Sequence, residues 1–141
     1  MNDYKRVEGV LHSYKSIQAS IKNLHLQIED IKDDVSISSS NFDAVDSGKC
    51  DSKGNSSKVE TEALQRQHRI ALIQREIRSK ERLVQRVDNA LETLTDDDKH
   101  LVRLRYFDKV DMNALAIRYN LSNRGMYHKK TIIIRQLIDI L

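Results

Sequence analysis

A basic, donor-rich stretch near the C-terminus offers the clearest chemistry in the sequence. Between Ser122 and Arg135 the chain carries four Lys or Arg side chains and no Asp or Glu. Arginine can form two hydrogen bonds with guanine and asparagine two with adenine, while hydroxyl, imidazole and ammonium groups bind phosphates. The stretch therefore predicts contact with double-stranded DNA, and the alternative is a solvated basic face of a small helical domain. The candidate DNA-binding residues are Ser122, Asn123, Arg124, Tyr127, His128, Lys129 and Lys130.

The residues around the start of this stretch suit a tight turn between two helices. Ala116 is small where the helices would cross, and Asn120 tolerates a left-handed backbone conformation. Leu121 is apolar after the turn, Ser122 can cap the next helix, and Met126 then faces inward. We expect helices over residues 99–106, 112–119 and 122–140, which matches the helix-turn-helix plan.

The sequence contains no residue pattern typical of a metal site, a cofactor site or an enzyme active site. The five histidines are dispersed and no HExxH or CxxC motif occurs, so no metal site is expected. The acidic trio at 96–98 is explained by helix capping, because consecutive side chains at a helix start point in different directions. Cys50 is the single cysteine, lies among polar residues and forms no intrachain disulfide. No Gly-rich phosphate loop is present, so we expect neither a cofactor nor an enzyme activity.

A long helix is expected at the start of the chain. Apolar residues recur there at intervals of three and four, which predicts a helix of about 30 residues with a coiled-coil seam. The polar residues 36–57 that follow are predicted to form a flexible loop. The seam positions are Val7, Val10, Tyr14, Ile17, Ile21, Leu24, Ile28, Ile31 and Val35.

A second seam runs from Val59 to Leu94, interrupted by Arg66 and Lys80. The expected fold is therefore all-α. A long antiparallel coiled-coil hairpin occupies residues 1–94, with its Ser-rich loop at 36–57, and a helix-turn-helix DNA-binding domain occupies 95–141. Because a two-helix hairpin is thin, its seams also suit pairing with a second copy, and we expect a homodimer.

Composition and charge agree with this organisation. The 141 residues include no Pro or Trp and only four Gly, which disfavours a turn-dense β-sandwich. Within the formal net charge of +3, residues 95–141 carry nine Lys or Arg against six Asp or Glu. No run approaches the roughly 18 apolar residues of a membrane span, and no apolar signal segment follows the N-terminus. We expect a cytoplasmic protein without membrane association.

Several short motifs resemble those of a known family. LTDDDKHLVRLRYF at 94–107, NALA at 113–116, LS at 121–122 and MYHKK at 126–130 resemble the region 4 helix-turn-helix of bacterial sigma factors. With its long helical first half, the chain resembles the late-transcription regulators of Gram-positive phages, the ArpU/RinA/LtrC-like group. The resemblance covers residues 4–141, most closely the C-terminal part. It implies a DNA-binding activator of phage late genes that acts on host RNA polymerase in the bacterial cytoplasm.

The resemblance also implies roles for particular residues. The recognition helix would begin at Ser122, and its DNA-facing positions would be Asn123, Arg124, Tyr127, His128 and Lys129. Arg118, on the preceding helix, would reach the DNA backbone.

Two departures from the family pattern affect the recognition helix. Gly125 stands where the family has Thr or Arg. Lys129 and Lys130 stand where the family has Leu or Ile, so one of them must lay its aliphatic stem over the core. The core stripe of this helix is then expected at Ile133, Leu137 and Ile140.

Two other functions fit the same features. A phage DNA-packaging protein like a small terminase subunit also combines a helix-turn-helix with a helical oligomerisation segment. A helical adaptor would bind RNA polymerase or another protein through the hairpin, with the basic face incidental. A ring of many subunits would favour packaging, and weak dependence of binding on salt would favour the adaptor.

Overall fold

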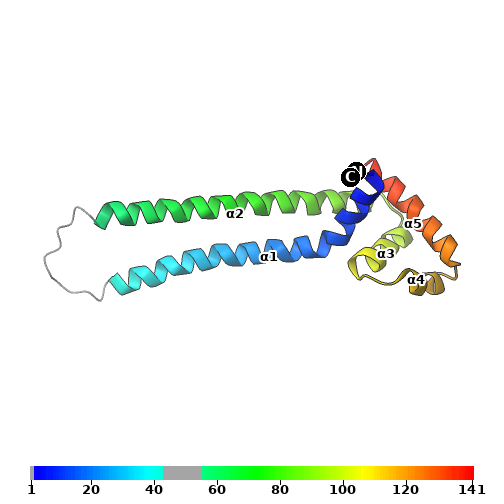
Figure 1. The fold of residues 1–141 in the computed structure, drawn as a ribbon, viewed down its shortest axis with the longest axis horizontal. Helices are drawn as coiled ribbons and strands as arrows, with labels where there is room; N and C mark the ends of the chain where they lie inside the picture. Colours follow the sequence, from blue (N-terminus) through cyan, green and yellow to red (C-terminus); the bar gives the residue numbers. More distant parts are fainter. Residues whose placement is uncertain (1, 43–54) are drawn as a thin grey trace. The chain divides into compact units, whose positions relative to one another are not determined.

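The computed structural model describes residues 2–42 and 55–141, and the side chains of residues 2–34 and 58–141. Its regular elements are α1 (Asp3–Phe42), α2 (Asn55–Glu92), α3 (Asp96–Val102), the π-helical segment η1 (Arg103–Phe107), α4 (Met112–Arg118) and α5 (Asn123–Ile138) (Figure 1). The described residues contain no strand. The predicted all-α class is confirmed.

Both long helices extend further than the sequence indicated. α1 continues to Phe42 and α2 begins at Asn55, so the predicted loop at 36–57 is helical over residues 36–42 and 55–57. Neither stretch contains Pro or Gly, and extending an existing helix costs far less free energy than starting one. The rest of the predicted loop, residues 43–54, lies outside the described residues.

The chain divides into two compact units. The first unit comprises residues 1–19 and 81–141, and the second comprises residues 20–80. The first turns of α1 and the last turns of α2 therefore belong with α3, η1, α4 and α5. No helix among the described residues is long and apolar enough to cross a membrane.

In the second unit, α1 and α2 run side by side in opposite directions (Figure 1). Their buried side chains are Leu24, Ile28, Ile31 and Ile77. The first two form a cluster with Ile77, and half-buried isoleucines pack around that cluster. Val59, the first position of the predicted second seam, is 54% exposed, so this end of the seam is not covered. The apolar core of this unit is consequently small.

The first unit has the larger core, to which every helix contributes. Leu11 has no exposed surface although it lies outside the predicted seam, whereas Val10 within the seam is only half-buried. A narrow seam suffices for a pair of helices, but α1 packs here against several elements and buries a wider stripe. Tyr14 adds a stacked ring contact with Phe107, at 4.3 Å between centroids, and its hydroxyl donates to Asp88 at 2.6 Å.

The core stripe of α5 differs from the prediction at one position. Ile133 and Leu137 are buried as expected, but Ile140 is 47% exposed. α5 ends at Ile138, so the helical spacing that would place Ile140 on the core side does not reach it. Ile134, which has no exposed surface, completes the stripe instead.

A widened helical turn carries Tyr106 into the core. The amide of Asp108 donates to the carbonyl of Arg103 at 2.9 Å, five residues back, which is the π-helical pattern. The segment buries both Leu104 and Tyr106, and Tyr106 is only 1% exposed. The chain then leaves the helix through Lys109, whose φ is 60°.

Candidate nucleic-acid interface

α4 and α5 are joined by a tight turn of the kind that the residue types predicted. The amide of Leu121 donates to the carbonyl of Ala116 at 2.9 Å, which closes the turn. Asn120 has a φ of 54°, the left-handed conformation, and Ala116 is 2% exposed where the two helices pack. The predictions for Ala116 and Asn120 are confirmed.

The start of α5 is fixed by a side-chain cap. Ser122 is the N-cap residue, and its hydroxyl accepts a hydrogen bond from the amide of Gly125 at 3.0 Å. A Cβ at Gly125 would lie 3.2 Å from that same hydroxyl oxygen, so the glycine leaves room for the cap. Met126 follows with no exposed surface, which confirms its predicted inward direction.

The turn gives a local test of stability. Asn120→Ala is expected to lower the free energy of unfolding by about 1 kcal/mol, because alanine disfavours a left-handed backbone. Asn120→Gly is the matched variant and should stay close to the wild type. Urea unfolding followed by circular dichroism measures both. An equal loss in the two variants would mean that the asparagine side chain, not the backbone conformation, supplies the stability.

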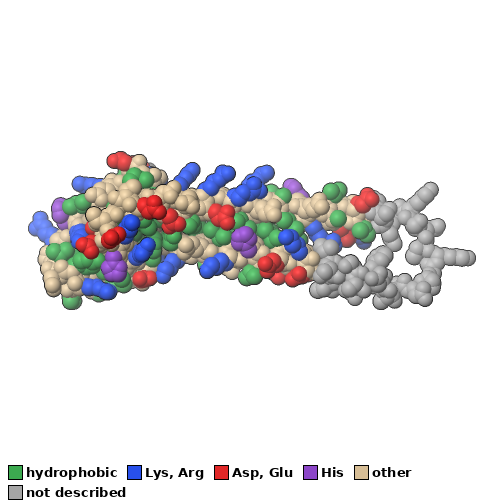
Figure 2. All heavy atoms as spheres, turned by 180° about the vertical axis from the view of Figure 1, so that it is seen from behind, with side chains coloured by type: hydrophobic (Ala, Val, Ile, Leu, Met, Phe, Trp, Pro, Cys, Tyr) green, Lys and Arg blue, Asp and Glu red, His purple; other side chains and the backbone are tan. Residues whose placement is uncertain are grey.

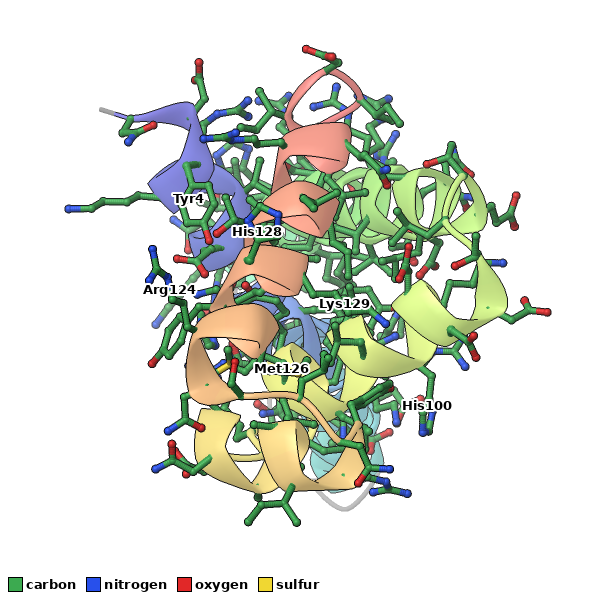
Figure 3. All side chains as sticks on the ribbon, turned by 90° about the vertical axis from the view of Figure 1, so that its right-hand side faces the viewer. Tyr4, His100, Arg124, Met126, His128 and Lys129 are labelled. Atoms are coloured by element: carbon green, nitrogen blue, oxygen red, sulfur yellow. The ribbon has the colours of Figure 1, made fainter. Side chains whose placement is uncertain are left out.

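The outer face of α5 presents the predicted donor side chains to solvent. Asn123, Arg124, Tyr127 and His128 are all exposed, and Tyr127 retains 52% of its surface. Figure 3 shows Arg124 and His128 extending outward from α5, while Lys129 leaves the helix on another flank. Arg118, the last residue of α4, is exposed as well. The predicted DNA-binding residues that are exposed therefore lie on α5 and at the C-terminal end of α4.

The two neighbouring lysines of α5 have different surroundings. The ammonium of Lys129 lies 5.0 Å from the centre of the Tyr119 ring. The side chain of Lys130 is 13% exposed, and its ammonium donates to Glu8 of α1 at 2.9 Å. Lys130 is thus the lysine whose stem lies over the core, while Lys129, also half-buried, lies against Tyr119.

Negative charge lies close to the Lys129 side of the interface. Burial and the charges of Asp97 and Asp98 raise the pKa of Tyr119, although the charge of Arg118 lowers it. These two aspartates belong to the first turn of α3, whose N-cap Thr95 accepts from the amide of Asp98 at 3.3 Å. They help to cap α3, and they bound the basic surface on that side.

Comparison with known proteins places the chain in a family. A sequence model of the DUF722 family matches residues 6–139. The chain belongs to the DUF722 family. That family is described as proteins of unknown function, and no curated protein or solved structure matches the chain.

The interface of this DUF722 chain can offer hydrogen-bond donors and positive charge. On the face of the molecule drawn in Figure 2, Lys and Arg side chains lie among Asp and Glu side chains. Within the described part of the chain, no three His, Cys, Asp or Glu side chains gather as metal ligands. The exposed hydrogen-bond donors and positive charges of α5 are suited to recognition of a polyanion.

The sequence interpretation of this DUF722 chain missed the partners of Lys130. Glu8 of α1 accepts a hydrogen bond from Lys130, and Tyr106 of η1 donates a second one to the same carboxylate. Both residues are distant from α5 in the sequence. The available signal was Lys130 itself, because a lysine on a core-facing position needs a buried or half-buried acceptor.

Proposed function

We propose that the protein is a sequence-specific DNA-binding transcription regulator. In this proposal α4 and α5 form a helix-turn-helix, and α5 is the recognition helix that enters the major groove. The observation that carries the proposal is the two-sided character of α5. Its outer face exposes Asn123, Arg124, Tyr127 and His128, whereas its inner face is anchored by buried Met126, Ile133, Ile134 and Leu137.

The gene class is proposed from the resemblance described above. Likeness to sigma region 4 and to late-transcription regulators of Gram-positive phages supports activation of phage late genes, with host RNA polymerase as a partner. The small core of the second unit supports a homodimer, because exposed apolar residues such as Leu64 and Leu72 on α2 leave surface for a second copy.

Fluorescence anisotropy with two DNAs tests the proposal. The full chain is titrated with DNA from upstream of its neighbouring late operon and with random DNA, each over a salt series. A preference of about a hundredfold or more for the upstream DNA is expected of a specific regulator. Equal binding to both DNAs would contradict it. Sedimentation of the same sample separates a dimer from the ring expected of a packaging protein.

Arg124 is expected to read a base edge. Arg124→Ala should weaken binding to the upstream DNA by about 1–3 kcal/mol and relax the preference at one base position. Arg86→Ala is the matched control, because Arg86 is equally an exposed arginine but lies on α2. Anisotropy against a set of single-base variants of the site measures both effects. Unchanged base preference in Arg124→Ala would remove this residue from direct readout.

A further inference from the structure

One carboxylate links α1 to both η1 and α5 within the first unit. A single oxygen of Glu8, Oε1, accepts hydrogen bonds from the hydroxyl of Tyr106 at 2.7 Å and from the ammonium of Lys130 at 2.9 Å. The Glu8 and Lys130 side chains are only 22% and 13% exposed. A salt bridge this enclosed loses less to solvent screening than a surface pair does, and removing one partner leaves the other charge unpaired.

The charges of this cluster are matched at neutral pH. Burial raises the pKa of Glu8, but the hydrogen bonds from Lys130 and Tyr106 and the positive charge of Lys130 outweigh burial, so the pKa is lower than the ordinary value. Glu8 is therefore ionised in the folded protein. The Tyr106 ring also meets the ring of His12 edge-on, at 4.7 Å between centroids, which adds a second contact to α1.

The same cluster lies directly behind a proposed DNA-facing residue. The ammonium of Lys130 lies 5.4 Å from the centre of the Tyr127 ring and 5.8 Å from that of Tyr4. Tyr4, labelled in Figure 3, belongs to the first turn of α1, so Lys130 lies close to aromatic rings of both α1 and α5. Lys130 therefore contacts the ring of one exposed residue of α5, Tyr127, while its ammonium is paired with Glu8 of α1.

We infer that Glu8 is a positioning residue of the DNA-binding site, which holds α5 in place through Lys130. In this inference Lys130 forms an ion pair inside the protein and does not contact a DNA phosphate. The inference rests on the proposed function. It assigns α1, which lies outside the helix-turn-helix, a part in DNA recognition. Glu8 touches no DNA in this assignment and acts only through Lys130 and Tyr106.

Exchanging the two charges separates an internal role from a phosphate contact. Glu8→Gln and Lys130→Met are each expected to lower the ratio of specific to random DNA affinity by about tenfold. The double variant Glu8→Lys with Lys130→Glu restores an ion pair in reverse, and its ratio should return to within about threefold of the wild type. All variants are full-length chains, assayed at a temperature at which circular dichroism shows each one folded.

Salt dependence separates an internal ion pair from a phosphate contact, whereas the affinity ratio of folded variants separates a positioning role from a merely structural one. Lys130→Met should leave the slope of log affinity against log salt unchanged, whereas loss of a phosphate contact reduces its magnitude by about 0.9. A reduced slope would show that Lys130 contacts phosphate and overturn the inference. An exchanged pair whose affinity ratio stays as low as that of Lys130→Met would overturn it as well. Folded variants that melt earlier but keep the wild-type ratio would also overturn it.

Failure of the proposed function is distinguishable in the same experiment. A wild-type chain that binds neither DNA, or that binds both equally, would refute the proposed function and the inference with it. A wild type that prefers the upstream DNA, accompanied by variants with the same preference, would refute the inference alone.

Discussion

Residues 95–141 expressed alone are expected to remain unfolded and to bind DNA about a hundredfold or more less tightly than the full chain. The reason lies in the core of the first unit, where Val7 and Leu11 of α1 and Val87 of α2 have almost no exposed surface. Each fully buried side chain of this kind contributes about 1.5–3 kcal/mol, and a domain's net stability is only about 5–15 kcal/mol. The fragment also loses Glu8, the partner of Lys130.

The matched control for this fragment removes the other unit instead. Replacing residues 20–80 by a short Gly/Ser linker keeps all residues of the first unit. This chain is expected to unfold cooperatively and to keep its contacts at the DNA interface, although a dimer held by the second unit would be lost. Thermal melts and DNA titrations measure both chains. A cooperative melt of residues 95–141 alone would contradict the prediction and locate the folding unit within α3–α5.

The features that the sequence predicted correctly are local ones. The cap at Ser122 depends on residues three positions apart, and the left-handed turn at Asn120 depends on the tolerance of one residue type. Met126 faces inward because its spacing from the cap is fixed by helical geometry. Such features are decided within one or two helical turns, so no knowledge of the tertiary structure is needed to predict them.

The features that the sequence did not predict depend on which helices meet. Leu11 is buried because α1 packs against more than α2, and a heptad pattern cannot show that. Glu8 and Tyr106 meet across 98 positions of the chain, and Lys130 reaches Glu8 across 122. Helix ends were also missed, since residues 36–42 have the polar composition of a loop but no residue that stops a helix.

Local features and tertiary contacts determine different parts of the candidate site. The identity of the exposed donors on α5 follows from helical spacing, and Asn123, Arg124, Tyr127 and His128 are exposed as that spacing requires. The different environments of Lys129 and Lys130 follow from Glu8 of α1, which pairs with Lys130, and from Tyr119, the C-cap residue of α4, which lies under Lys129. Sequence spacing alone therefore left open which lysine is paired inside the protein.

Reversing two arginine charges at the proposed interface should nearly abolish DNA binding without unfolding the protein. Arg118→Glu with Arg124→Glu is expected to weaken binding to both specific and random DNA by about a hundredfold or more, because two attractions to DNA become repulsions. Both side chains are exposed and neither forms an ion pair with a described residue, so the melting temperature should change little.

A control variant with the same change in net charge separates the effect of where these arginines lie from the effect of total charge. Arg82→Glu with Arg86→Glu alters two exposed arginines of α2, outside the proposed helix-turn-helix. It should weaken DNA binding by less than about fivefold, since charges farther from the bound DNA are screened by salt. Anisotropy at two salt concentrations compares the two double variants. Equal losses would mean that overall charge, and not the α4–α5 surface, attracts DNA, and the α4–α5 surface would lose its assignment as the reading face.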